Sequence, residues 1–169
     1  MNTEDTTRPR HEISYSVGIT GTKKGGSRRQ VEGLRRLFTD MSINSDRNKK
    51  VIELHHGDCK GVDWEAFAIA NKVFRNVSLT LITVSHPPLD GKHRAFTKND
   101  QTRKAKEYLQ RNMDIVDETD WMIALPDSPN EKLRSGTWAT IRYAKKQNKS
   151  VIIILPSGVV RTIKIEMKK

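Results

Sequence analysis

The chain has 169 residues, a length typical of one domain, and its 35% of hydrophobic residues is enough to form a core. Its single cysteine excludes an internal disulfide, and no apolar run resembles a bilayer span or a signal peptide, so we expect a soluble cytoplasmic protein. The net charge of +11 favours anionic partners such as nucleotides or nucleic acid, but the basic residues are scattered, and a solvated surface explains them equally well.

Strand-like and helix-like segments alternate along the chain. Polar residues 1–12 predict a flexible tail, and residues 13–169 predict a single domain. Apolar runs predict strands at 13–20, 51–55, 77–84, 120–125 and 151–155. Apolar residues at helical spacing predict helices at 27–41, 62–74, 102–119 and 135–147. This order predicts an α/β fold, a Rossmann-like three-layer sandwich with a mostly parallel central sheet of about five strands. The alternating run at 159–167 predicts an added C-terminal edge strand.

Three polar loops that contain glycine follow predicted strands, and in a parallel sheet such loops gather where ligands bind. In the first loop, 21–26, the glycines let the backbone approach a phosphate, and the next helix offers unpaired N–H groups. It is neither a Walker loop nor a GxGxxG motif, and a plain turn before a helix would look similar. We predict that Gly21, Thr22 and Lys23 contact a phosphate.

In the second loop, Gly57 and Gly61 bracket a tight turn. Asp58 and Asp63 are predicted to accept hydrogen bonds from ribose hydroxyls or a base edge. Asp63 is equally well explained as a carboxylate in the first turn of a helix, where the helix dipole favours it.

The histidines beside this loop suggest a metal site, but adjacent strand residues point to opposite faces of a sheet. His55 and His56 therefore cannot easily bind one ion, and no metal site is predicted. Cys59 has no evident histidine partner, so it is not predicted to act as a nucleophile.

The third region combines one arginine in a helix with a helix start farther along the chain. Arg111 is either solvated or a planar fork aimed at a phosphate or carboxylate. Ser135, Gly136 and Thr137 open the last predicted helix after Arg134, and they offer backbone N–H groups and two hydroxyls. We predict that all five residues contact a ligand.

One long irregular segment, 85–101, interrupts the pattern. A loop of this length in a compact domain is usually functional or mobile. It is either a lid, in which His86, His93 and Arg94 close over a bound anion, or a solvated connection.

These residues resemble the SLOG superfamily, which contains LOG-type nucleotide phosphoribohydrolases and the DNA-processing protein A family. The stretch GDCKGVDWEA is similar to the second glycine loop of that superfamily, although Phe67 stands where the pattern has histidine. Arg111 precedes Asp120 by nine residues, and WMIALP follows Asp120, as in the LOG pattern. The resemblance covers nearly the whole chain and looks closest to a small single-domain branch of bacterial and phage proteins. It implies a Rossmann-like fold, a nucleotide site and a homodimer or larger assembly.

The chain departs from the LOG pattern at the residues that cut the N-glycosidic bond. Residues 127–134 replace the glycine pair after Pro126, and Thr140 stands at the position of the LOG glutamate. Threonine cannot supply the acid–base chemistry of that carboxylate. Asp58, Asp63 and Glu131 are the candidates for a relocated carboxylate, so no catalytic residue is assigned and no cofactor is expected.

Three functions are therefore open at the level of sequence. The first is a protein that senses or sequesters a phosphorylated nucleotide or ADP-ribose-type signal, in nucleotide signalling or phage defence. The second is a nucleotide N-glycosidase with a relocated carboxylate. The third is a DNA-binding protein distantly similar to DNA-processing protein A, which the charge favours but no motif supports.

Overall fold

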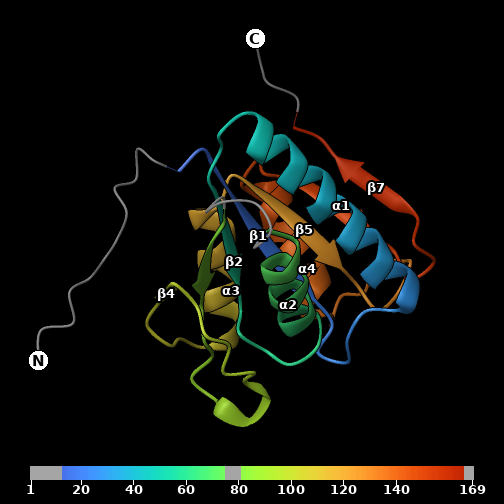
Figure 1. Cartoon of the computed structure of the whole chain (residues 1–169). Coiled ribbons are helices and arrows are strands. Elements are labelled where there is room, and N and C mark those ends of the chain that lie inside the picture. Colours follow the sequence, from blue (N-terminus) through green and yellow to red (C-terminus); the bar gives the residue numbers. More distant parts are fainter. Residues whose placement is uncertain (1–12, 75–80, 166–169) are drawn as a thin grey trace, which may run out of the picture.

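A computed structural model describes residues 13–74 and 81–165 (Figure 1). The predicted tail at 1–12 lies outside the described residues, as do the first residues of the predicted strand 77–84. The described strands are β1 (Tyr15–Gly21), β2 (Ile52–His56), β3 (Leu81–Ser85), β4 (Gln101–Thr102), β5 (Trp121–Leu125), β6 (Ser150–Ile154) and β7 (Val160–Ile163). The described helices are α1 (Arg28–Arg47), α2 (Val62–Phe74), α3 (Tyr108–Glu118), α4 (Gly136–Lys146) and the short 3₁₀ helix η2 (Gly91–His93).

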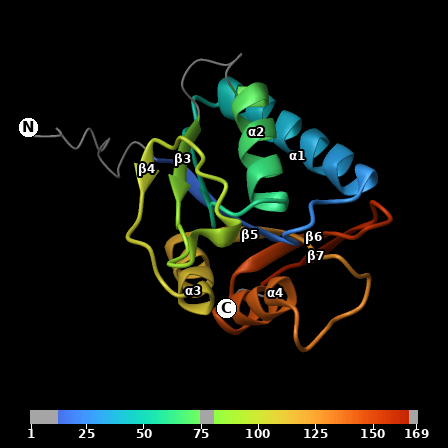
Figure 2. The ribbon, with the colours of Figure 1, turned by 90° about the horizontal axis from the view of Figure 1, so that it is seen from below.

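The strands form one sheet in the order β4-β3-β2-β1-β5-β6-β7. All neighbours pair in parallel except β7, which runs antiparallel to β6 as the predicted edge strand. Helices α1 and α2 cover one face of the sheet, and α3 and α4 cover the other (Figure 2). The predicted three-layer α/β sandwich is confirmed.

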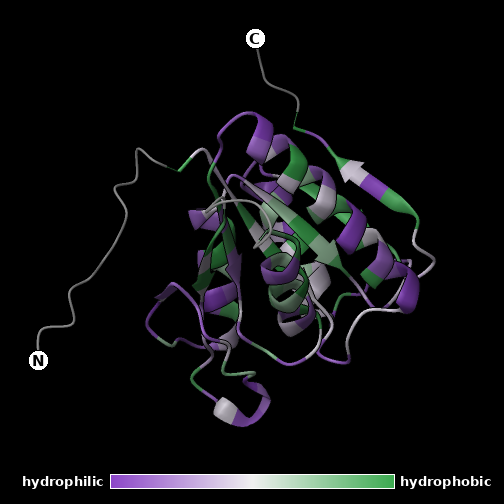
Figure 3. Ribbon diagram, in the orientation of Figure 1, coloured by the Kyte–Doolittle hydropathy of each residue, from purple (hydrophilic) through white to green (hydrophobic). Residues whose placement is uncertain are grey.

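Each face of the sheet has its own apolar core. The larger cluster joins α1 and α2 to the sheet, and the smaller one joins α3 and α4 to it. Strand β6 is predominantly hydrophobic, while α1 and β7 carry both hydrophobic and hydrophilic residues (Figure 3). No helix in the described ranges is both long and apolar enough to cross a membrane.

Two predicted boundaries are wrong. Helix α1 continues to Arg47, because Ser42 and Ser45 lie on its buried face where the pattern had predicted a polar loop. Helix α3 begins only at Tyr108, because the preceding residues form β4 and then continue alongside the end of β3, where the N–H groups of Arg103 and Lys106 donate to the carbonyls of Ser85 and Pro87 at 2.8 and 3.3 Å. The Asp100 carboxylate accepts hydrogen bonds from the N–H and hydroxyl of Thr83 at 2.8 and 3.0 Å.

Candidate functional site

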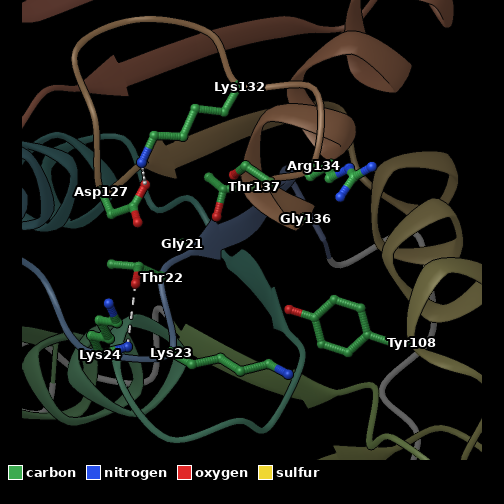
Figure 4. A pocket seen from close by; sticks show the side chains of 11 residues that line it. Gly21, Thr22, Lys23, Lys24, Tyr108, Asp127, Lys132, Arg134, Gly136 and Thr137 are labelled. Atoms are coloured by element: carbon green, nitrogen blue, oxygen red, sulfur yellow. Dashed lines mark hydrogen bonds and ion pairs between the residues drawn. The ribbon is translucent and has the colours of Figure 1, made fainter.

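The sheet has a topological switch point between its neighbouring strands β1 and β5. The chain leaves β1 for α1 on one face of the sheet and leaves β5 for α4 on the other. In open parallel sheets, ligands bind in the crevice that forms outside the strand ends at such a point. A cavity of about 450 Å³ opens there. Its lining is Gly21, Thr22, Lys23, Lys24, Tyr108, Asp127, Lys132, Arg134, Ser135, Gly136 and Thr137 (Figure 4).

The first loop forms one wall of this cavity, as its sequence predicts. Thr22 continues from β1, and its N–H donates to the carbonyl of Leu125 at 3.3 Å. The Thr22 hydroxyl accepts a hydrogen bond from the N–H of Lys24 at 3.2 Å, which folds the loop over. The ammonium of Lys23 lies 4.3 Å from the centre of the Tyr108 ring. The loop therefore presents a hydroxyl and two ammonium groups beside the strand end.

The start of α4 forms the opposite wall. Ser135 caps the helix by accepting a hydrogen bond from the N–H of Trp138 at 3.3 Å. The N–H groups of Gly136 and Thr137 belong to the first turn, where an α-helix has no acceptor of its own for them. The positive end of the helix dipole adds to the cations around it. This wall is suited to hold an anion.

The start of α1, in contrast, does not line the cavity. Ser27 and Gln30 close it with a capping box, in which each side chain accepts from the backbone N–H of the other. The N–H of Gly26 donates to the Glu65 carboxylate at 2.8 Å. The first loop contributes its strand end to the cavity, whereas the start of the helix that follows it is not part of the lining.

The charge of the cavity is predominantly positive. Four cationic side chains line it, and Asp127 is the one carboxylate among the described lining residues. Asp127 lies 3.4 Å from the ammonium of Lys132 (Figure 4). Sequence reasoning missed both residues, because it treated 127–134 only as an insertion. It also missed Tyr108, which it placed inside a longer helix.

The second loop does not reach the cavity. Asp58 is completely buried, and its carboxylate is fully occupied by the 86–100 segment. It accepts from Arg94 Nε at 2.7 Å, and from the N–H and hydroxyl of Thr97 at 2.9 and 2.6 Å. Asp58 therefore holds a neighbouring segment in place rather than facing the ligand crevice.

Asp63 and Arg111 are likewise buried behind the cavity. Arg111 is 2% exposed, its Nη1 lies 3.7 Å from Asp63 Oδ2, and its Nη2 lies 3.3 Å from the sulfur of Cys59. The guanidinium stacks 4.5 Å from the centre of the Tyr108 ring. Burial raises the pKa of Asp63 against the opposing effect of Arg111, and burial also raises the pKa of the Cys59 thiol. The thiol is therefore protonated at neutral pH, not a nucleophilic thiolate.

The two glycines of the second loop make room for other parts of the site. A Cβ on Gly57 would lie 1.3 Å from Arg111 Nη1, so this glycine makes space for the buried guanidinium. Gly61 has a φ of +88°, and a Cβ there would lie 2.5 Å from the backbone of Thr22 and Lys23. The N–H of Val62 donates to the carbonyl of Thr22 at 3.1 Å. The second loop thus supports the first loop from behind.

The three lid candidates also lie outside the cavity lining. The carbonyl of His93 accepts from the N–H of Lys60, and Arg94 pairs with Asp58, so this part of the segment covers the second loop. His86 is 2% exposed, with its Nε2 2.8 Å from Nδ1 of His55. Burial, helped by His55 and Arg103, lowers the pKa of His86 to about 2. In this structure the segment covers the second loop, not the cavity.

The carboxylates considered as substitutes for the LOG glutamate are not at the cavity either. Thr140 is buried and donates its hydroxyl to the carbonyl of Gly136 at 2.9 Å. Glu131 pairs with Arg142 at 2.8 Å and does not line the cavity.

Of the predicted site residues, the structure brings together Gly21, Thr22, Lys23, Arg134, Ser135, Gly136 and Thr137.

Comparison with solved structures supports the fold. A molybdenum cofactor binding protein from the phototrophic bacterium Rippkaea orientalis matches with a TM-score of 0.61 at 17% identity, over 83% of this chain and 76% of that one. The structural genomics target TM1055 matches with a TM-score of 0.51 at 14% identity, over 81% of this chain and 72% of that one. No family model and no curated protein matches the sequence. At these identities the likeness shows a Rossmann-like fold and nothing more about chemistry.

Proposed function

We propose that the cavity between β1 and β5 binds a phosphorylated nucleotide or an ADP-ribose-type molecule, and that the protein senses or sequesters this ligand. The observation that carries the proposal is the lining itself: four cations and the start of α4 surround one carboxylate at the switch point of the sheet. The cavity volume of about 450 Å³ lies in the usual range for small-molecule sites, about 300–1,000 Å³.

The phosphate would lie between the two walls. The N–H groups of Gly136 and Thr137 would donate to it from α4, and the hydroxyl of Thr22 would face it from the first loop. Arg134 would supply a planar pair of donors, which suits phosphate better than a point charge does. Charge-assisted hydrogen bonds of this kind contribute about 1.5–3 kcal/mol each.

The nucleoside would use the remaining lining. Tyr108 is the one aromatic residue in the described lining, and its ring could stack against a base once the Lys23 ammonium moves off it. Asp127 takes over the role that the sequence had suggested for Asp58 and Asp63, because its carboxylate can accept hydrogen bonds from ribose hydroxyls.

Calorimetric titration with AMP, ADP, ADP-ribose and cyclic ADP-ribose tests this proposal, with adenosine as the ligand that lacks phosphate. We expect at least one phosphorylated compound to bind and adenosine to bind much more weakly. Arg134→Ala should reduce affinity tenfold to about a hundredfold, following the energy of a charge-assisted bond. Arg161→Ala is the matched control, because it removes an exposed arginine from β7, away from the cavity. Absence of binding by the folded protein, or equal losses in both variants, would overturn the proposal.

Hydrolysis remains the alternative, and it is favoured by the presence of Asp127 in the cavity. A carboxylate beside a bound ribose can stabilise an oxocarbenium-like transition state. If free base accumulates during long incubation with the ligand, and Asp127→Asn abolishes its release, the protein is an N-glycosidase.

DNA affinity that falls steeply with salt would instead support the nucleic-acid hypothesis.

A further inference from the structure

A second cluster of polar side chains lies buried on the sheet face that α3 covers, and it shares no residue with the cavity. His55 and Glu53 both point to this face from β2. His86 follows β3, and Glu118 is the last residue of α3. His56 points to the opposite face, where its ring lies 5.5 Å from that of Phe67 on α2. The sequence was therefore right that His55 and His56 cannot share an ion, but the partner of His55 is His86.

Three ligand atoms of this cluster surround one point. Nδ1 of His55 lies 2.8 Å from Nε2 of His86, and the Oε2 atom of Glu118 lies 3.7 Å and 3.9 Å from these two nitrogens. A point equidistant from the three atoms is about 2 Å from each, and zinc in proteins binds nitrogen and carboxylate oxygen at about 2.0–2.2 Å. This point lies in the plane of the three atoms, so a tetrahedral ion would require the two imidazole nitrogens to move apart and Glu118 to move closer.

The residue behind His55 sets its tautomer. Its Nε2 lies 2.5 Å from Oε1 of Glu53, and a carboxylate there accepts a hydrogen bond from the Nε2–H of the ring. Nδ1 then carries the lone pair, which accepts the hydrogen bond from Nε2–H of His86 and becomes available to an ion once His86 gives up that proton. A carboxylate that holds the far nitrogen of a ligating histidine is the usual outer partner in zinc sites, where it orients the ring and raises its basicity.

Access and charge decide whether an ion can enter. Both imidazoles are buried, but the Glu118 side chain is 31% exposed and connects the cluster to solvent. Arg103 opposes a cation, because its Nε donates to Oε2 of Glu118 at 2.9 Å. The Arg103 side chain is 34% exposed, so it can turn outward when an ion takes that oxygen. Arg103 therefore weakens the site without blocking it.

We propose that His55, His86 and Glu118 bind one divalent transition-metal ion of the zinc class. Two histidines and one carboxylate leave the fourth tetrahedral position to solvent, the arrangement found in zinc sites that keep one position open. Cys59 is not one of the proposed ligands, because its sulfur lies beside Arg111 instead. In the absence of metal the same atoms form the hydrogen-bonded chain Glu53–His55–His86.

The experiment uses the full chain treated with a chelator and then dialysed. Zn²⁺ is titrated by calorimetry, and Co²⁺ by the intense visible bands that a four-coordinate ion gives. We expect one ion per chain, and at least tenfold weaker binding in Glu118→Gln and His86→Gln. Glu53→Gln should lose affinity about tenfold to a hundredfold, because it removes the outer carboxylate. His93→Gln is the control, since it removes an exposed histidine outside the cluster and should leave binding unchanged.

Arg103→Gln keeps the proposal testable even if the buried variants fold poorly. It leaves the three ligands in place and removes the competing cation, so it should bind Zn²⁺ more tightly than the natural chain. Circular dichroism checks that each variant is folded. Failure of the folded natural chain to bind a stoichiometric ion would overturn the proposal. So would unchanged affinity in folded Glu118→Gln and Arg103→Gln, or loss of binding in His93→Gln.

Discussion

Gly61 is the residue through which the second loop supports the cavity, and Gly61→Ala measures this support. Its φ of +88° lies in the left-handed region, and a methyl group would meet the carbonyl carbon and oxygen of Lys23 and the oxygen of Thr22 at 2.5 Å. The contacted atoms are backbone, so no side chain can rotate to relieve the clash. The left-handed φ costs about 1–2 kcal/mol, and overpacking adds about 1–3 kcal/mol. We expect the variant to lose about 3 kcal/mol of unfolding free energy.

Chemical denaturation measured by circular dichroism gives this loss, with Gly91→Ala as the matched control. Gly91 begins η2 within the segment between β3 and β4, but a Cβ there meets nothing within 4 Å, and its φ is not in the left-handed region. The control should stay within about 0.5 kcal/mol of the natural chain. Gly61→Ala should also bind phosphorylated nucleotides more weakly while still folded, because the first loop must move. If both variants unfold at the same denaturant concentration, the role assigned to the second loop is wrong.

Three further predictions concern buried charged and titratable groups. With a chelator present, stability should fall as the pH drops from 6.5 toward 5, because the folded pKa of His86 is about 2 and only the unfolded chain gains a proton there. The loss attributable to His86 is about 2 kcal/mol at pH 5, and the difference between the natural chain and His86→Gln isolates it from the opposite effect of Asp63. Asp58→Asn should lower the free energy of unfolding by about 1–3 kcal/mol and speed proteolysis within 86–100. It should change nucleotide affinity less than tenfold. A selective loss of affinity would instead indicate that Asp58 contacts the ligand. Arg111→Met should destabilise the fold by about 3–5 kcal/mol in thermal or chemical unfolding, because it leaves Asp63 buried without its cation. Unchanged stability with lost nucleotide binding would instead assign Arg111 to the ligand.

Patterns of neighbouring residues were sufficient to predict the three layers of the fold, the first loop and the start of α4. The apolar runs and helical spacing predicted the alternation of strands and helices, since both periods are properties of adjacent residues. The first loop and the start of α4 were predicted because each directly follows or precedes its own element. The additional charges of the cavity, Asp127 and Lys132, lie in a segment without any periodic pattern.

The second loop looked the same as the first in sequence but has a different role. What distinguishes it is a covering segment more than thirty positions away: Thr97 reaches Asp58 across a separation of 39 residues. No local pattern encodes that contact. The pairing of His55 with His86 was missed for the same reason, because it depends on the register between β2 and β3.

The dependence of one loop on another has a consequence for the order of folding. The backbone of Thr22 is fixed by Val62 behind it and by Leu125 beside it, and the opposite wall begins only at Ser135. These contacts close long stretches of chain, and such closures form slowly because each carries a large entropic cost. During synthesis the cavity cannot assemble until residues beyond 137 have left the ribosome. A bound ligand would therefore report that this half of the sheet has reached its final topology.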